Sequence, residues 1–372
     1  MKRLILLVLL LSFLLPGRAV AAEPSAASMI LYEPRTGTVL RQRGADERRL
    51  IASTTKIMTA LVVLEHSRLS RSVTITDAQS GIEGSSMGLL PGDSYTIEEL
   101  LYGLMLASGN DAAIALAEHT AGSVEAFVEW MNEKAAALGL ANTHFENPHG
   151  LDGEQHYSSA RDLALLTAAA MENPDFCRLF AAREYQIHGL TFRNHNKLLE
   201  GYDGCIGGKT GYTRAAGRTL VSVAERDGLR LICVTLSDPN DWADHAALYD
   251  EAFSGYRFLT FPDEQWRAVP VISSTASAVP LQCDAPFALM RRDEETALHV
   301  SLPRFVFAPV RCGDRLGTVR IVRSGKVIWK SDLLAAADAP VDPQQRLRPW
   351  ERFAPFKDRY PTGAFAENLF SA

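Results

Sequence analysis

A serine and a lysine stand three residues apart in the stretch LIASTTKIMTALVVLEH, at Ser53 and Lys56. Residues separated by three positions share one face of a helix, so the hydroxyl of Ser53 and the amine of Lys56 can meet. The apolar positions that follow repeat at near-helical spacing and predict a face that packs into the protein. These positions are Ile57, Met58, Leu61, Val62 and Leu64. An ammonium group on such a face is costly to bury, so Lys56 either reaches water or has a use in its buried place.

The chemistry that such a pair could perform is nucleophilic catalysis. A serine hydroxyl is a weak nucleophile unless a neighbouring base takes its proton. The amine of Lys56 can be that base only when it is neutral near pH 7, which burial or a nearby second cation favours. Ser-x-x-Lys alone is a weak signal, and taken by itself it is better explained as a chance pattern of common residues.

Two later stretches carry side chains that would complete such a site. LMLASGNDAAIALAEH places Ser108-Gly109-Asn110 at the start of a helix with apolar periodicity. GCIGGKTGYTRAAGRTLVSVA places Lys209-Thr210-Gly211 at the start of a strand that continues through Val223. Glycines in this strand leave room for the backbone of a ligand to approach its edge. Lys209 offers a positive charge, and the hydroxyl of Thr210 could bond to a carboxylate.

The order Ser-x-x-Lys, Ser-Asp-Asn and Lys-Thr-Gly is typical of penicillin-binding proteins and class A β-lactamases. All three patterns occur here in that order, with Gly109 in the middle slot. The chain resembles the low-molecular-mass penicillin-binding proteins, which are serine-type D-alanyl-D-alanine carboxypeptidases. The resemblance covers most of residues 28–260, and the segment after 262 resembles the second domain of that family. It is carried by IASTTKIMTALV, GSSMGLLPGDSYTIEELLYGLMLASGNDAAIALAE, ANTHFENPHGLDGEQHYSSARDLALL and GGKTGYT.

The resemblance implies a catalytic role for three residues. Ser53 would attack the carbonyl between the last two D-alanines of a peptidoglycan stem peptide and form an acyl-enzyme. Lys56 would be the base that activates it. Ser108 would bridge Lys56 and Lys209 and help to pass a proton to the leaving D-alanine.

The resemblance also implies how substrate is held. Asn110 would bind the substrate amide, and Lys209 and Thr210 would hold the terminal carboxylate beside Gly211. The oxyanion would sit on the backbone N–H groups of Ser53 and Tyr212. β-Lactam antibiotics would be covalent inhibitors, and no metal or organic cofactor is implied.

Several departures and alternatives stay open. Some relatives also grip the carboxylate with an arginine after the Lys-Thr-Gly strand, but LSDPNDWADH has none. Lys209 and Thr210 are left for this task, with Arg214 as a further candidate. Glu146 stands at a place comparable to the deacylating glutamate of class A β-lactamases, although a solvated loop residue is the favoured interpretation. His144, His149 and His156 lie near it without the spacing of a metal site. The rival functions are a β-lactamase, a D,D-endopeptidase and a non-catalytic β-lactam sensor.

The first residues predict export. MKRLILLVLLLSFLLPGRAVAAEP has a basic start, a short apolar run and small residues at Ala19-Val20-Ala21, as in a secretory signal peptide over residues 1–22. The protein is therefore expected in the bacterial cell envelope, at the outer face of the cytoplasmic membrane or outside the cell. The formal net charge of -6 carries no nucleic-acid footprint.

Pattern along the rest of the chain predicts an α+β fold. A hairpin is expected within 23–51, and helices at 53–66, 97–107, 110–121, 124–139 and 160–171. Residues 145–162 are rich in turn formers and indicate a long surface loop between the last two helices. From about 185 the pattern changes to strands, two of them around Asp227-Gly228, followed by a closing helix. With the resemblance, this gives a β-lactamase/transpeptidase-like domain, an antiparallel sheet with a helical subdomain.

Composition and pattern divide the chain after the expected signal peptide (1–22) into three further parts. A catalytic domain is expected at 23–262, a small β-rich domain at 263–334 and an irregular tail at 335–372. Many relatives end in an amphipathic membrane-binding helix, but prolines break RLRPWERFAPFKDRY, so membrane contact is only weakly supported. Cys283 and Cys312 could form a disulfide, which the sequence does not decide.

Overall fold

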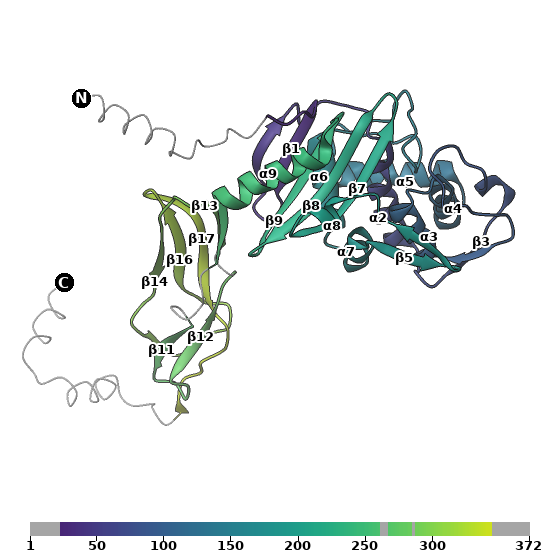
Figure 1. The fold of residues 1–372 in the computed structure, drawn as a ribbon. Helices are drawn as coiled ribbons and strands as arrows, with labels where there is room; N and C mark the ends of the chain where they lie inside the picture. Colours follow the sequence, from purple (N-terminus) through teal and green to yellow (C-terminus); the bar gives the residue numbers. More distant parts are fainter. Residues whose placement is uncertain (1–22, 261–266, 285–286, 344–372) are drawn as a thin grey trace, which may run out of the picture. The chain divides into compact units, whose positions relative to one another are not determined.

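The computed structural model describes residues 23–260, 267–284 and 287–343, which form two compact units divided between Ser254 and Gly255 (Figure 1). The division precedes the expected boundary at 262–263, because strand β10 (Tyr256–Thr260) pairs with β13 (Phe287–Arg291) and so belongs to the second unit. The expected signal peptide and the end of the tail lie outside the described residues. No helix within the described ranges combines the length and apolar character that a membrane span requires.

A five-stranded antiparallel sheet is the centre of the first unit, in the order β2-β1-β9-β8-β7. Its strands are β1 (Ser28–Glu33), β2 (Thr38–Arg43), β7 (Cys205–Thr213), β8 (Gly217–Arg226) and β9 (Leu229–Leu236). The expected Asp227-Gly228 turn joins β8 to β9, and both of its residues have positive φ, as a tight hairpin requires. β7, which carries Lys209-Thr210-Gly211, lies at one edge of the sheet.

The two faces of the sheet pack against different helices (Figure 1). Val221 and Val223 of β8 belong to the apolar core shared with most of the helices. Ser222, between them, points to the other face and bonds to His245 of helix α9 (Asp241–Gly255). This alternation follows from the two-residue repeat of a strand.

Most expected helices are present with boundaries shifted by a few residues. They are α2 (Lys56–His66), α3 (Ile97–Leu106), α4 (Asn110–Ala121), α5 (Val124–Ala137) and α6 (Ala160–Ala170). The expected start of the first helix at 53 is corrected, because residues 52–55 form a 3-10 turn, η1 (Ala52–Thr55), ahead of α2. Ser159 is the N-cap of α6, and its side chain accepts from the N–H of Asp162.

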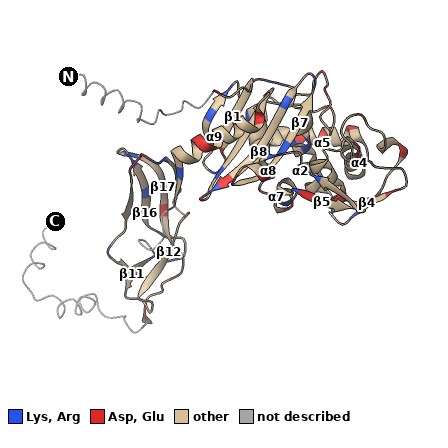
Figure 2. Ribbon diagram, in the orientation of Figure 1, with Lys and Arg blue, Asp and Glu red and all other residues tan. Residues whose placement is uncertain are grey.

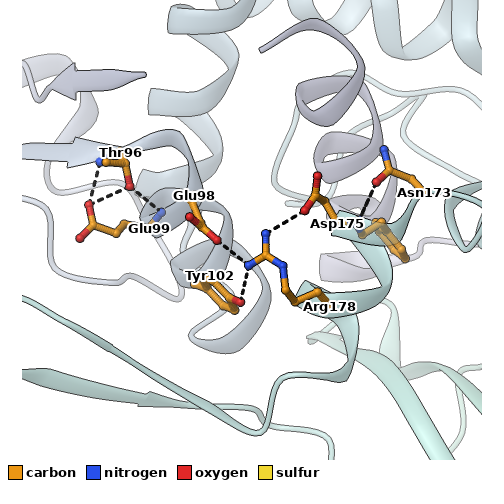
Figure 3. Close-up of polar contacts among 8 residues, drawn as sticks. Thr96, Glu98, Glu99, Tyr102, Asn173, Asp175 and Arg178 are labelled. Atoms are coloured by element: carbon orange, nitrogen blue, oxygen red, sulfur yellow. Dashed lines mark hydrogen bonds and ion pairs between the residues drawn. The ribbon is translucent and has the colours of Figure 1, made fainter. Parts of the chain in front are cut away.

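Further short elements surround these helices. They are the hairpin β3 (Ser72–Thr74) and β4 (Ser94–Thr96), helix α7 (Pro174–Ala181), the hairpin β5 (Glu184–Ile187) and β6 (Leu190–Arg193), and helix α8 (Leu198–Gly201). Thr96 and Glu99 form a capping box at the start of α3 (Figure 3). Arg178 of α7 pairs with Glu98 of α3 and also donates to the Tyr102 hydroxyl at 2.8 Å, which joins the two helices (Figure 3).

The described part of the second unit is rich in β-strands, as the sequence predicted. Its six-stranded sheet has the order β14-β16-β17-β12-β11-β15. The strands are β11 (Ala268–Ile272), β12 (Ala278–Gln282), β14 (Thr296–Ser301), β15 (Val306–Phe307), β16 (Arg315–Arg323) and β17 (Lys326–Ala335). Bridges from Ala339 to Val310 and from Val341 to Ser274 carry ordered pairing past the expected end at 334. Cys283 and Cys312, both described, are not joined by a disulfide.

Basic and acidic residues are interspersed along the ribbon of each unit (Figure 2). This distribution agrees with the small negative net charge of the chain.

Candidate active site

Ser53 lies in the 3-10 turn immediately before α2 and is partly exposed. The turn is held by side chains from within it: the hydroxyls of Thr54 and Thr55 donate to the carbonyls of Ile51 and Ala52 at 2.6 and 2.9 Å. Ala52 has a φ of +47°, a left-handed conformation that costs ~1–3 kcal/mol for a non-glycine residue. The Ser53 hydroxyl is thus presented by a turn that surrounding contacts must hold in place.

Lys56 is fully buried, and its Nζ has three hydrogen-bond partners. These are Oγ of Ser53 at 2.9 Å, Oδ1 of Asn110 at 2.7 Å and the carbonyl of His149 at 2.6 Å. The carbonyl and the amide oxygen can only accept, so a neutral amine would give its two N–H groups to them. Its lone pair would then point at the hydroxyl of Ser53, which is the arrangement that a general base requires.

The electrostatics of the site favour the neutral amine. Burial holds the pKa of Lys56 well below its usual value, and the charge of Lys209 lowers it further. The carboxylate of Asp111 acts in the opposite direction. The Asp111 carboxylate already accepts hydrogen bonds from the backbone N–H groups of residues 87–89, and it fixes that loop beside α4.

Ser108 and Asn110 lie at the junction of α3 and α4. Ser108 has a φ of +57° and is 4% exposed, and its Oγ accepts from Nζ of Lys209 at 3.0 Å. Asn110 opens α4, and its Nδ2 donates to the carbonyl of Glu83 at 2.6 Å, which turns Oδ1 towards Lys56. The hydrogen bonds of these described residues therefore join Lys56 to Asn110 and Lys209 to Ser108. The expected bridge from Ser108 to Lys56 is not among them.

Strand β7 closes the other side of the site. Lys209 is 1% exposed, and burial lowers its pKa to about 7. Gly211 follows two positions later and faces the turn of Ser53: a Cβ there would lie 2.9 Å from the Ser53 backbone nitrogen. Thr210 is partly exposed between them, and the Tyr212 side chain is 68% exposed. β7 is an edge strand of the sheet, and an extended peptide can pair with a strand of this kind.

The three stretches singled out in the sequence therefore meet. Ser53 lies in η1 and Lys56 in α2, and Ser108 and Asn110 lie at the α3–α4 junction. The other residues singled out belong to β7: Lys209, Thr210, Gly211 and Tyr212. Arg214, considered as a carboxylate ligand, is exposed in the turn after β7. Glu146 is exposed and accepts from the N–H of Gln155 at 3.0 Å.

The loop that follows α5 is part of this site, which corrects its expected place as a solvated surface loop. Besides the His149 carbonyl, its Pro148 carbonyl accepts from Thr59 of α2 at 2.5 Å. Gly150, with a φ of +95°, packs so closely on Ala52 that any Cβ there would overlap the Ala52 carbonyl. Within the described ranges, no three His, Cys, Asp or Glu side chains are grouped to hold a metal ion.

The geometry can support acyl transfer: a hydroxyl at the start of a helix, an amine whose burial favours its neutral form, a second lysine, and an edge strand. Comparison with known proteins points the same way. The sequence model of a family described as D-alanyl-D-alanine carboxypeptidase matches residues 17–240.

Individual relatives extend over most of the chain. It is 33% identical to D-alanyl-D-alanine carboxypeptidase DacF of Bacillus subtilis, over 84% of this chain and 85% of the relative. It is 32% identical to DacA of Escherichia coli, over 88% and 86% respectively. Among solved structures, penicillin binding protein 5 of Haemophilus influenzae superposes with a TM-score of 0.70 at 28% identity, covering 86% of this chain and 98% of that one.

Proposed function

The chain belongs to the D-alanyl-D-alanine carboxypeptidase family of serine peptidases, and from this we propose that Ser53 is the nucleophile and Lys56 the general base of that reaction. The observation that carries the proposal is the 2.9 Å contact between Nζ of Lys56 and Oγ of Ser53. The other two partners of this amine, Oδ1 of Asn110 and the carbonyl of His149, can only accept hydrogen bonds.

In the first half-reaction Oγ of Ser53 bonds to the carbonyl carbon of the penultimate D-alanine, and its proton passes to Lys56. The oxyanion is held by the backbone N–H groups of Ser53 and Tyr212. When the C–N bond breaks, the proton goes to the leaving amine of the terminal D-alanine. We assign Ser108, whose Oγ accepts from Nζ of Lys209 at 3.0 Å, an assisting role in this transfer.

In the second half-reaction water attacks the acyl ester. Lys56 takes a proton from the water, the ester C–O bond breaks, and the proton returns to Oγ of Ser53. The product is a stem peptide shortened by one D-alanine.

Lys209 and Thr210 hold the terminal carboxylate of the substrate, and Gly211 lets β7 approach the turn of Ser53 closely. A carboxylate beside Lys209 favours the charged ammonium, so substrate binding restores the cation that burial alone weakens. The same carboxylate is present in penicillins, which would acylate Ser53 and remain bound. Asn110 holds Lys56 and lies beside the substrate amide.

We place this activity in the bacterial cell envelope, on peptidoglycan stem peptides that end in D-Ala-D-Ala. The apolar N-terminal segment expected to be a signal peptide supports export. Glu146, the residue that the β-lactamase alternative would use, is exposed and accepts from the backbone N–H of Gln155.

The test is the release of D-alanine from diacetyl-lysyl-D-alanyl-D-alanine by the wild type and by Ser53→Ala, with and without penicillin. Release that disappears in the variant and under penicillin, with penicillin mass added to the Ser53 peptide, is the expected result. A folded wild type that binds penicillin but releases no D-alanine would contradict the proposed substrate and favour the endopeptidase or the sensor.

A further inference from the structure

A buried histidine lies between the turn of Ser53 and the loop that contacts Lys56. His156 is 1% exposed, and its two ring nitrogens are both engaged. Nε2 lies 2.7 Å from Oγ1 of Thr55, and Nδ1 accepts from the backbone N–H of Glu146 at 3.1 Å. The catalytic steps described above make no use of this side chain.

The direction of each bond follows from its partners. A backbone N–H can only donate, so Nδ1 is unprotonated and the ring proton of a neutral His156 is on Nε2. Nε2–H therefore donates to Thr55, whose own hydroxyl proton goes to the carbonyl of Ala52 at 2.9 Å. These hydrogen bonds form a series from Glu146 through His156 and Thr55 to Ala52, the residue before Ser53.

Burial keeps the imidazole of His156 neutral, so the directions of these hydrogen bonds are fixed. It lowers the pKa of His156 to about 3, and the charges of His149, His144 and Lys56 act in the same direction. The ring is consequently neutral at any pH near neutrality, and its donor and acceptor do not exchange.

The same histidine fixes the loop. Its Nδ1 holds the loop at Glu146, three residues before His149, whose carbonyl accepts from Lys56 at 2.6 Å. On the other side, Gly150 rests directly on the Ala52 carbonyl that Thr55 also contacts. One imidazole thus touches both parts of the structure that surround the Ser53–Lys56 pair.

We propose that His156 is a positioning residue for the acylation step: through Thr55 it holds the strained turn of Ala52 that presents Ser53, and through Glu146 it holds the loop carbonyl that orients Lys56. This inference rests on the proposed roles of Ser53 and Lys56. The energetic basis is that a displacement of about 1 Å between reacting groups can lower a rate by about 10²-fold.

The experiment measures the second-order rate of acylation by a fluorescent penicillin across pH 5–9, together with the melting temperature, for a set of full-length variants. His156→Leu keeps the bulk but removes both bonds, whereas the amide of His156→Gln can donate to Thr55 and accept from Glu146. Thr55→Val and Thr55→Ser make the same comparison at the other end of the first bond. His144→Gln is the control, because the ring of His144 hydrogen-bonds to the carbonyl of Gln155 and its contacts with Tyr157 lie away from Thr55 and Lys56.

We expect His156→Leu and Thr55→Val to acylate roughly 10- to 100-fold more slowly. We also expect the pH at which the acylation rate rises, the acid limb of its pH profile, to move to higher pH. Water admitted beside Lys56 would relieve the desolvation that lowers its pKa, so the pKa of Lys56 would rise. His156→Gln, Thr55→Ser and His144→Gln should stay near the wild-type rate and profile.

A lower melting temperature with unchanged acylation rate and pH profile in His156→Leu and Thr55→Val would overturn the proposal and leave His156 a purely structural residue. If His156→Leu does not fold, the pair Thr55→Val and Thr55→Ser decides on the same criteria. A separate result tests the proposed function: acylation of Ser53→Ala by the fluorescent penicillin would contradict the role of Ser53 as nucleophile, whatever the His156 variants show.

Discussion

Gly211 of β7 and Ser53 of η1 are packed so closely that a Cβ on residue 211 would lie 2.9 Å from the Ser53 backbone nitrogen and 3.1 Å from Cβ of Ala52. Real Cβ atoms are not found at the first of these distances, so the backbone of one element would have to move. A Cβ there would also lie 2.4 Å from Oγ1 of Thr219. The close approach of β7 to the turn of Ser53 therefore depends on the absence of a side chain at residue 211.

Gly211→Ala should lower the acylation rate about 10²-fold, because the turn of Ser53 must shift away from β7. The measurement is the rate of penicillin acylation by stopped flow, with circular dichroism to show that the fold persists. Gly201→Ala is the matched control, since a Cβ at Gly201 meets nothing within 4 Å, and it should leave the rate unchanged. Equal rates for Gly211→Ala and wild type would contradict the packing.

The base role of Lys56 predicts that Lys56→Arg is inactive although it keeps the charge. A guanidinium stays protonated at any working pH and has no lone pair to take the proton of Ser53. We expect acylation to fall by about 10²–10⁴-fold, the usual contribution of a general base. Lys134→Arg, at a surface pair with Glu65, should acylate at the wild-type rate. Acylation of Lys56→Arg within threefold of wild type would rule out Lys56 as the base.

The charge of Lys209 predicts a shift in the pH dependence of acylation. That charge lowers the pKa of Lys56, so its removal in Lys209→Met raises the pKa, and the neutral amine is reached only at higher pH. The acid limb of the profile should therefore move to higher pH, whatever the loss in overall rate. Lys209→Arg keeps the positive charge, and its acid limb should not move upward. An identical limb in Lys209→Met and Lys209→Arg would refute the coupling.

What the sequence could predict was local. Ser53 and Lys56 are three residues apart, and the Asp227-Gly228 turn carries its own conformational preference, so a short window is enough to recognise them. The place of the loop after α5 could not be read in this way. Its contact with Lys56 spans 93 positions, and its contributing atom is the backbone carbonyl of His149, which no residue type reveals. The glycine at 150 suits this place, because glycine readily adopts the φ of +95° that residue 150 has in the structure.

The start of the first helix shows the same limit. Helical periodicity from Ser53 onward is continuous, yet the first turn is 3-10, with Ala52 in a left-handed conformation. Contacts from Thr219 of β8, which donates to the Ile51 carbonyl at 3.1 Å, and from the loop at Gly150 override the local preference. Strain of this kind is found where the surrounding structure determines a functional geometry.

A second buried histidine predicts how stability depends on pH. His245 of α9 bonds to Ser222 at 2.7 Å and to Thr235 at 3.0 Å, and burial lowers its pKa to about 3. Between pH 6.5 and about 3 the unfolded state binds a proton that the folded state does not. The free energy of unfolding should therefore fall as pH decreases through this window, with a slope of up to ~1.4 kcal/mol per pH unit from this residue.

His245→Gln can keep both hydrogen bonds but cannot take up a proton, so its unfolding free energy should depend less steeply on pH from 6.5 to 4.5. Urea unfolding of both proteins at several pH values measures the two slopes. The variant is expected to be less stable than wild type at pH 7.5, because an amide fits the imidazole site imperfectly, and the difference should narrow towards pH 4.5. A difference that stays constant across this range would show that His245 is already protonated in the folded protein, or that its burial does not govern the acid response.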